Sequence, residues 1–181
     1  MKIAAKHRPL VIGGIGLIAL PIVLKAVGLT LDNATVVVLL CMAAMGLNVL
    51  VGTTGLVSFG HSAWFGIGGY AAAIAHLRWF PSSFVLPLVF SVGFTALLAL
   101  AVGFVILRRR GVYFSLLTRA LCALTFAIAF RWTAVTGGEG GLGGIERRAL
   151  GPVGLDNHLN YYVVVALIAF GVLWALWRVM R

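Results

Sequence analysis

Apolar residues dominate the chain in runs that short polar breaks interrupt. Most of these runs are about 20 residues long, the length at which an α-helix crosses the hydrocarbon core of a bilayer. The runs cover residues 9–29, 34–51, 62–77, 84–107, 111–130 and 161–177. The pattern predicts an all-α fold, a polytopic transmembrane helical bundle of about six spans.

One stretch departs from this pattern. Residues 48–70 read NVLVGTTGLVSFGHSAWFGIGGY, so glycines and small polar residues crowd into an otherwise apolar segment. Glycine frees the backbone and lets helices approach closely. Non-helical backbone at membrane depth is tolerated only where protein or a water-filled cavity covers it. The stretch is interpreted as an interrupted segment inside the bundle, close to whatever passes through. A tight helix–helix contact without such a role is an equal alternative.

Composition and charge fit a membrane protein. The chain is 62% hydrophobic and 10% charged, and its mean hydropathy is +1.10. A net charge of +10 would suggest nucleic acid as the partner of a soluble protein. Here Lys and Arg lie at the ends of apolar runs, so we interpret them as topological signals and expect no nucleic-acid partner. The basic amino terminus, Arg108–Arg110 and the pair Arg178 and Arg181 are expected on the cytoplasmic side. Four arginines fall on the other side and weaken this rule, namely Arg78, Arg131, Arg147 and Arg148.

The fifth run has polar residues at helical spacing. Ser115, Thr118, Arg119, Cys122 and Thr125 fall within a face roughly 120° wide at 100° per residue. Arg119 lies near mid-membrane, where a charge costs about 2.5–3.5 kcal/mol on insertion scales. The face is therefore expected to point into the bundle or a wet cavity. It either lines a pathway, or Arg119 pairs structurally with a backbone carbonyl or another subunit.

Residues suited to catalysis are scarce. The four acids, Asp32, Glu139, Glu146 and Asp156, lie in predicted loops, which excludes paired carboxylates within the membrane. The sequence GGEGGLGG at 137–144 lacks the Lys-Ser or Lys-Thr of a phosphate loop. It is expected to be a flexible outer loop that orders against a partner. His61 is expected to be a packed hydrogen-bonding group, and Cys41 and Cys122 small buried residues. The chain is not expected to be an enzyme.

Three stretches carry a family resemblance: GLNVLVGTTGLVSFGHSAWFGIGGYAAA, LRRRGVYFSLLT and FRWTAVTGGEGGLGGI. In order and spacing, from about residue 45 to 145, they resemble permease subunits of branched-chain amino acid ABC importers, the LivM type. The resemblance implies an importer of leucine, isoleucine, valine or related solutes such as urea and amides. It also implies a second, LivH-type permease, two cytoplasmic ATPases that hold ATP-Mg, and a periplasmic solute-binding protein. The chain itself would hold no cofactor and lie in the inner membrane.

The resemblance also implies roles for individual residues. Ser58, Gly60 and His61 are expected along the substrate pathway by this resemblance, and the polar residues Asn48, Ser115, Thr118 and Arg119 are expected there with them. Gly137, Gly138 and Glu139 are expected to meet the binding protein.

The sequence departs from the family at two places. The family usually has an apolar residue where Arg119 stands and often Gln near Cys122, and it continues beyond a point like Arg181. Residues 1–181 are therefore expected to form a single permease membrane domain truncated at its carboxy end. The alternative function is a small stand-alone membrane channel or a non-transporting structural bundle.

Overall fold

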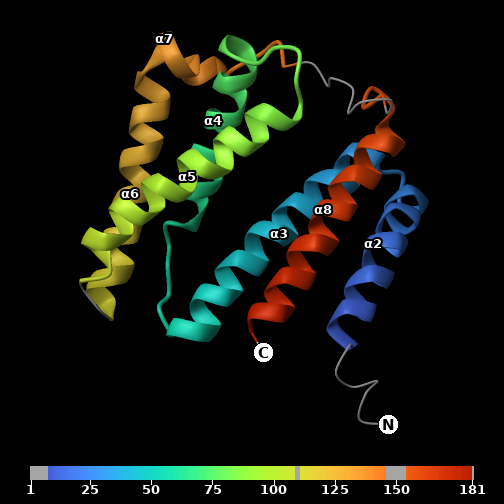
Figure 1. Cartoon of the computed structure of the whole chain (residues 1–181), viewed down its shortest axis with the longest axis horizontal. Coiled ribbons are helices and arrows are strands. Elements are labelled where there is room, and N and C mark those ends of the chain that lie inside the picture. Colours follow the sequence, from blue (N-terminus) through green and yellow to red (C-terminus); the bar gives the residue numbers. More distant parts are fainter. Residues whose placement is uncertain (1–7, 109–110, 146–153, 181) are drawn as a thin grey trace. The chain divides into compact units, whose positions relative to one another are not determined.

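The computed structural model describes residues 8–108, 111–145 and 154–180, and the elements that it describes are helical (Figure 1). The long helices are α2 (Arg8–Ala26), α3 (Leu31–Thr54), α4 (His61–Arg78), α5 (Val85–Ile106), α6 (Val112–Arg131) and α8 (His158–Val179). A short α7 (Thr133–Thr136) and a 3₁₀ turn η1 (Gly138–Gly140) follow α6. The prediction of an all-α bundle is confirmed. Several charges used to predict orientation lie outside the described residues, namely Lys2 and Lys6 of the amino terminus, Arg109, Arg110, Arg147, Arg148 and Arg181, as does Glu146.

Each long helix lies where an apolar run predicted one. Four of them, α3, α5, α6 and α8, are long and apolar enough to cross a membrane. The apolar part of α2, Leu10–Ala26, is slightly shorter. Helix α4 is less apolar, because it carries His61 at its start and His76 and Arg78 in its last turn. Helix α3 begins at Leu31, three residues earlier than expected, so Asp32 lies in its first turn, where the helix dipole favours an acid.

The chain separates into two compact units, which are described in turn. The first comprises α2, most of α3, and α8. Its core joins α3 and α8 through Ala34, Val38, Tyr162, Val165 and Ala169, and all of these except Tyr162 are small or β-branched. Tyr162 also donates a hydrogen bond of 2.6 Å from its hydroxyl to the carbonyl of Leu17, which ties α8 to α2. A single membrane domain over residues 1–181 stays a prediction.

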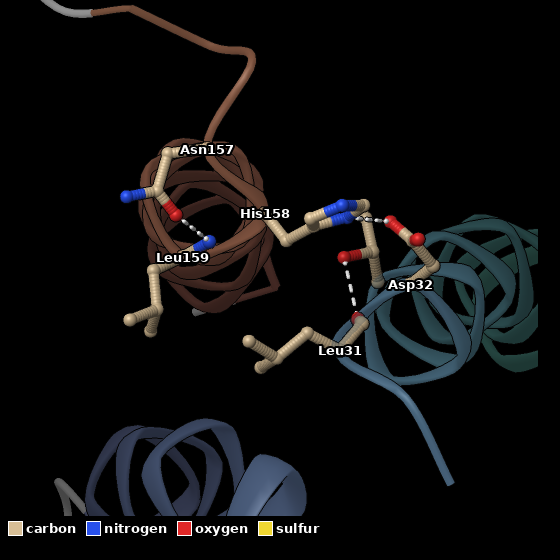
Figure 2. A network of polar contacts seen from close by, with 6 residues as sticks. Leu31, Asp32, Asn157, His158 and Leu159 are labelled. Atoms are coloured by element: carbon tan, nitrogen blue, oxygen red, sulfur yellow. Dashed lines mark hydrogen bonds and ion pairs between the residues drawn. The ribbon is translucent and has the colours of Figure 1, made fainter.

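Polar contacts close one end of the first unit (Figure 2). Nδ1 of His158 lies 2.9 Å from Oδ1 of Asp32, so the first residue of α8 meets the first turn of α3. The side chain of Asn157 accepts a hydrogen bond from the amide of Leu159 and caps α8. Cys41, expected to be buried, is instead exposed on α3. The prediction treated every residue inside an apolar run as core, but much of a membrane helix faces outward.

The second unit comprises α4 to η1 and the residues that lead into α4. Helices α4 and α5 pack closely at Gly68, whose carbonyl accepts a hydrogen bond of 2.6 Å from the Ser91 hydroxyl. A Cβ at Gly68 would lie in ordinary contact with the Thr95 and Ser91 side chains, so the helices meet at this small residue. Trp79 packs edge-on against Phe90 at 5.0 Å between ring centroids, where α4 ends. These contacts hold α4 against α5, and residues 55–60 lead directly into α4.

Candidate functional site

The helix breaks at the place that the glycine-rich stretch predicted. Helix α3 ends at Thr54, residues 55–60 are not helical, and α4 begins at His61. Gly55 has a φ of +67°, a left-handed conformation that glycine adopts without steric cost and that stops the helix. The predicted interruption is therefore confirmed. An interruption leaves backbone groups without helical partners, and these need others if they lie at membrane depth.

Helix α6 supplies those partners with the polar face that its spacing predicted. The Ser115 hydroxyl donates a hydrogen bond of 2.7 Å to the carbonyl of Val57. The amide of Phe59 donates one of 3.2 Å to the Thr118 hydroxyl. Thr118 in turn donates to the carbonyl of Ser115 at 2.9 Å. We call this contact between residues 57–60 and Ser115 and Thr118 the break seam.

At Gly60 the backbones of the two segments that form the break seam are in contact. A Cβ at this position would collide with the carbonyl oxygen of Thr118 and lie 3.1 Å from the Thr118 Cβ. The Gly60 amide donates to the Ser58 hydroxyl at 3.3 Å. Ser58 and Thr118 keep 8% and 5% of their exposure, so both hydroxyls are removed from solvent within the unit. The glycine-rich stretch was interpreted either as part of a pathway or as a tight helix–helix contact. Both interpretations predict small and hydroxyl-bearing residues here, and the tight contact is what the geometry shows directly.

One further contact extends the break seam along α6. The Ser62 hydroxyl and the Cys122 thiol lie 3.2 Å apart, and either can donate. The sequence predicted that Cys122 is a small buried residue, whereas in the structure it is half-buried. The polar face of α6 therefore pairs with α4 and the residues before it at Ser115, Thr118 and Cys122.

Three predicted pathway residues stand apart from these contacts. His61 is half-buried at the first position of α4, and its ring makes no hydrogen bond in the described part of the chain. Asn48 is exposed on α3 and belongs to the first unit. Arg119 is exposed on α6 and does not pack against another helix of its own unit, and its expected place facing the bundle or a wet cavity stays a prediction. It lies at the edge of the polar face, about 100° from Thr118, and the close contact of Thr118 with Gly60 turns that edge outward.

The glycine-rich loop after α6 is a compact turn, at least through residue 141. Gly137, Gly138 and Gly141 have φ values of +77°, +60° and +65°. The Thr136 hydroxyl donates to the carbonyls of Ala129 and Trp132, at 2.6 and 2.8 Å, and so fastens the turn to the end of α6. Its composition predicted a flexible loop, whereas the positive φ angles at these three glycines let the backbone fold on itself.

The three residues predicted to meet a binding protein differ in what they offer. Gly138 is buried against Phe130 and Thr133, and Gly137 packs against Gly141, so both serve the turn itself. Glu139 is exposed and carries a charge, so it is the one with a side chain to present. Arg78 donates to the carbonyl of Ala134 at 3.1 Å, which joins the end of α4 to α7, just before this turn.

A cavity of about 1020 Å³ lies in the second unit between α4, α5 and α6, and the turn closes one end. Its walls are largely aromatic and aliphatic, with Trp64, Phe90, Phe94 and Phe126 among them. The Thr125 and Thr136 hydroxyls that line it already donate to backbone carbonyls. Such walls suit aliphatic groups, and Glu139 in the turn is the acidic side chain among the lining residues. Sequence reasoning missed this cavity, since the separation of three helices cannot be read from their spacing along the chain.

The site has no metal chemistry of its own among the residues that the structure describes. Within them, three or more His, Cys, Asp or Glu side chains nowhere gather to hold an ion. The hydroxyls of the break seam bind backbone, and no described acid lies beside them as a base. The arrangement can hold a bend in place, but it shows no means of bond breaking.

Comparison with known proteins supplies the remaining evidence. Residues 29–181 match the protein family described as branched-chain amino acid transport system / permease component. The high-affinity branched-chain amino acid transport system permease protein LivM of Escherichia coli K12 is 29% identical over 121 residues, which cover 67% of this chain and 28% of LivM. The protein of the same name from Salmonella typhimurium LT2 is 29% identical over 123 residues, with the same coverage. The match therefore spans little more than a quarter of the length of these relatives. No solved structure matches the chain significantly.

Proposed function

The chain belongs to the family of permease components of branched-chain amino acid transport systems, and from that membership we propose that it is the membrane subunit of an ATP-driven importer. The solutes are branched-chain amino acids or related small molecules such as urea and amides. Family members are transport components rather than enzymes, and the chain is a multi-pass membrane protein. The observation that carries the proposal is the family match over residues 29–181.

The break seam supports this proposal because it gives the unit a bend whose backbone is satisfied by side chains. Interrupted helices at membrane depth occur where they are covered by protein or line a cavity. Ser58, Gly60, His61, Ser115 and Thr118 gather at or beside the seam on two chain segments. In the proposal these five residues, with Asn48 and Arg119, border the route of the solute. Ser115 and Thr118 hold the bend beside this route. The imidazole ring of His61 makes no hydrogen bond among the described residues, so it is available to the solute.

The partners belong to the proposal as well. A LivH-type permease forms the other wall of the route, and two cytoplasmic ATPases bind ATP-Mg and drive it. A periplasmic binding protein delivers the solute to the turn at Gly137, Gly138 and Glu139. The amino terminus is then cytoplasmic and the membrane is the inner one. The basic residues at the amino terminus and Arg178 support this orientation.

Gene disruption in the native host tests the proposal. Uptake of radiolabelled leucine, isoleucine, valine and urea is measured in intact cells with and without the gene. Loss of uptake of at least one solute, with recovery from a plasmid copy, is the expected result. The Gly60→Trp variant should not restore uptake, because its ring cannot fit against the Thr118 carbonyl.

The alternative function gives a different result in a second measurement. A stand-alone channel would let the solute leave proteoliposomes that contain this chain alone, without ATP. A structural bundle would leave both uptake and leakage unchanged when the gene is removed. Either outcome would overturn the importer assignment.

A further inference from the structure

Helix α2 contains a proline in its interior, Pro21. In an α-helix the carbonyl of one residue accepts a hydrogen bond from the N–H of the residue four positions later. Proline has no N–H, so α2 has no such donor for the carbonyl of Leu17. Within the described range Arg8–Ala26, no other interior carbonyl lacks this donor, because no other residue beyond the first turn is a proline.

The missing donor is supplied from α8, which lies beside α2 in the first unit (Figure 1). The Tyr162 hydroxyl donates to the Leu17 carbonyl at 2.6 Å. Tyr162 is 5% exposed and Leu17 packs against the core, so little water reaches this bond. Prolines are tolerated in membrane helices where neighbouring helices satisfy the backbone groups that they leave unpaired. Tyr162 therefore replaces the hydrogen bond that Pro21 removes from α2.

On either side of this bond, α2 meets its unit through apolar contacts. Leu20 and Leu24 pack against the core. Gly13 faces α8 so closely that a Cβ would collide with the Leu173 side chain. Aliphatic packing is non-directional, and lipid tails are as apolar as leucine. A hydrogen bond depends on the position of both groups, so a shift of α2 by one residue, about 1.5 Å and 100°, would break it.

We infer that Pro21 and Tyr162 form a matched pair that sets the register of α2, meaning its axial position and rotation against α8. Pro21 leaves one carbonyl of α2 without a donor, and the Tyr162 hydroxyl binds that carbonyl rather than its neighbours. A single buried polar contact sets the register of paired helices in coiled coils in the same way. The inference goes beyond the proposed function and does not rest on it, because α2 ends before residue 29, where the family match begins.

A double-mutant cycle in the full chain, purified in detergent, tests the pairing. Tyr162→Phe alone should lower the melting temperature by about 2–4 °C, because the Leu17 carbonyl loses its donor. Pro21→Ala supplies an N–H at position 21, so the Leu17 carbonyl regains a donor within α2. Adding Tyr162→Phe to Pro21→Ala should therefore change the melting temperature by less than about 1 °C.

The matched control for the proline is Pro87→Ala in α5. Pro87 lies in the first turn of α5, where the N–H groups of a helix have no helical partner to lose. In this background Tyr162→Phe should keep its full effect of about 2–4 °C. An equal effect in the Pro21→Ala and Pro87→Ala backgrounds would overturn the inference, because Tyr162 would then act independently of the proline.

Spin-label distances in nanodiscs test the register itself. Labels are attached to cysteines introduced at Ile12 on α2 and Val179 on α8, which are 65% and 79% exposed. The native Cys41 and Cys122 are replaced by serine, and the serine at 122 keeps a polar group beside α4. The parent protein with these changes should show one narrow distance distribution.

Each member of the pair should then be needed for that narrow distribution. Tyr162→Phe and Pro21→Ala should each broaden it by at least about 1.5 Å, the rise of one residue, whereas Pro87→Ala should leave it unchanged. Distributions that stay narrow, with the same mean, in both Tyr162→Phe and Pro21→Ala would overturn the inference, since apolar packing alone would then set the register.

Discussion

The backbone amide of Phe59 donates to the side-chain hydroxyl of Thr118 at 3.2 Å, although 59 residues separate the two in the chain. The amide belongs to the non-helical residues before α4, and the hydroxyl to the second turn of α6. Thr118 thus replaces a partner that a continuous helix would have provided to the Phe59 amide. Thr118 therefore satisfies one backbone group of the break, as Ser115 does for the carbonyl of Val57.

Thr118→Val should destabilise the protein, since it is nearly the same size but cannot accept from the Phe59 amide. Leaving a buried donor unpaired costs about 1–3 kcal/mol. The measurement is the melting temperature of the detergent-solubilised protein, followed by fluorescence-detected size-exclusion chromatography after heating. Thr118→Ser keeps the hydroxyl and should lie close to the wild type. An unchanged melting temperature in Thr118→Val would contradict the role of this hydrogen bond.

Gly60→Ala should be the more severe of two glycine substitutions. Its methyl group would collide with the Thr118 backbone carbonyl, which cannot move without α6. Overpacking of this kind costs about 1–3 kcal/mol. The control is Gly69→Ala in α4, where a Cβ meets no atom within 4 Å and helix propensity favours alanine. Melting temperatures should fall for Gly60→Ala and hold or rise for Gly69→Ala. Equal values for the two variants would show that the backbones do not touch at Gly60.

Tyr162→Phe tests the packing of the first unit. The substitution removes the hydrogen bond of 2.6 Å from Tyr162 to the Leu17 carbonyl. That carbonyl lies four residues before Pro21, and the loss of its donor should cost about 0.5–1.5 kcal/mol. Tyr113→Phe is the matched control, because Tyr113 is 71% exposed. A lower melting temperature is expected only for Tyr162→Phe, and the prediction fails if the two variants melt together.

Glu139→Gln tests the proposed docking of a binding protein. The exposed carboxylate would make a rim contact worth about 0.2–1 kcal/mol, so the Kd should rise up to about fivefold. The measurement is the binding of solute-loaded binding protein to the importer in nanodiscs, at low and at high salt. The difference between wild type and variant should shrink at high salt. Glu139→Asp keeps the charge and serves as the control. An equal Kd for wild type and Glu139→Gln would show that residue 139 lies outside the interface.

Much of the fold could be predicted because bilayer thickness dictates the length of an apolar run. The long helices lie where runs of apolar residues were found, and glycine composition indicated the break before His61. Helical spacing also grouped Ser115, Thr118 and Cys122 on one face of α6. These features depend on local chemistry, which a single sequence contains.

Features that depend on rotation and packing could not be predicted. Arg119 shares a face with Thr118 by spacing, yet Thr118 is buried and Arg119 exposed, since a contact at Gly60 decides how α6 is turned. Glycines at 137, 138 and 141 suggested flexibility, whereas their positive φ angles and the Thr136 hydroxyl build a turn. The cavity depends on three helices being held apart, a property of the assembled unit.

The hydroxyls of the break seam hold the non-helical residues without taking any backbone hydrogen bond from α6. Thr118 already donates to a carbonyl of its own helix, so losing Phe59 leaves its proton bonded. Ser115 can rotate about one bond and donate to a carbonyl one turn earlier in α6. Detaching residues 55–60 would leave every backbone hydrogen bond of α6 in place, but the Phe59 amide and the Val57 carbonyl would lose their partners. Such rotations take picoseconds to nanoseconds, so the rate of bending would be set by the movement of whole helices.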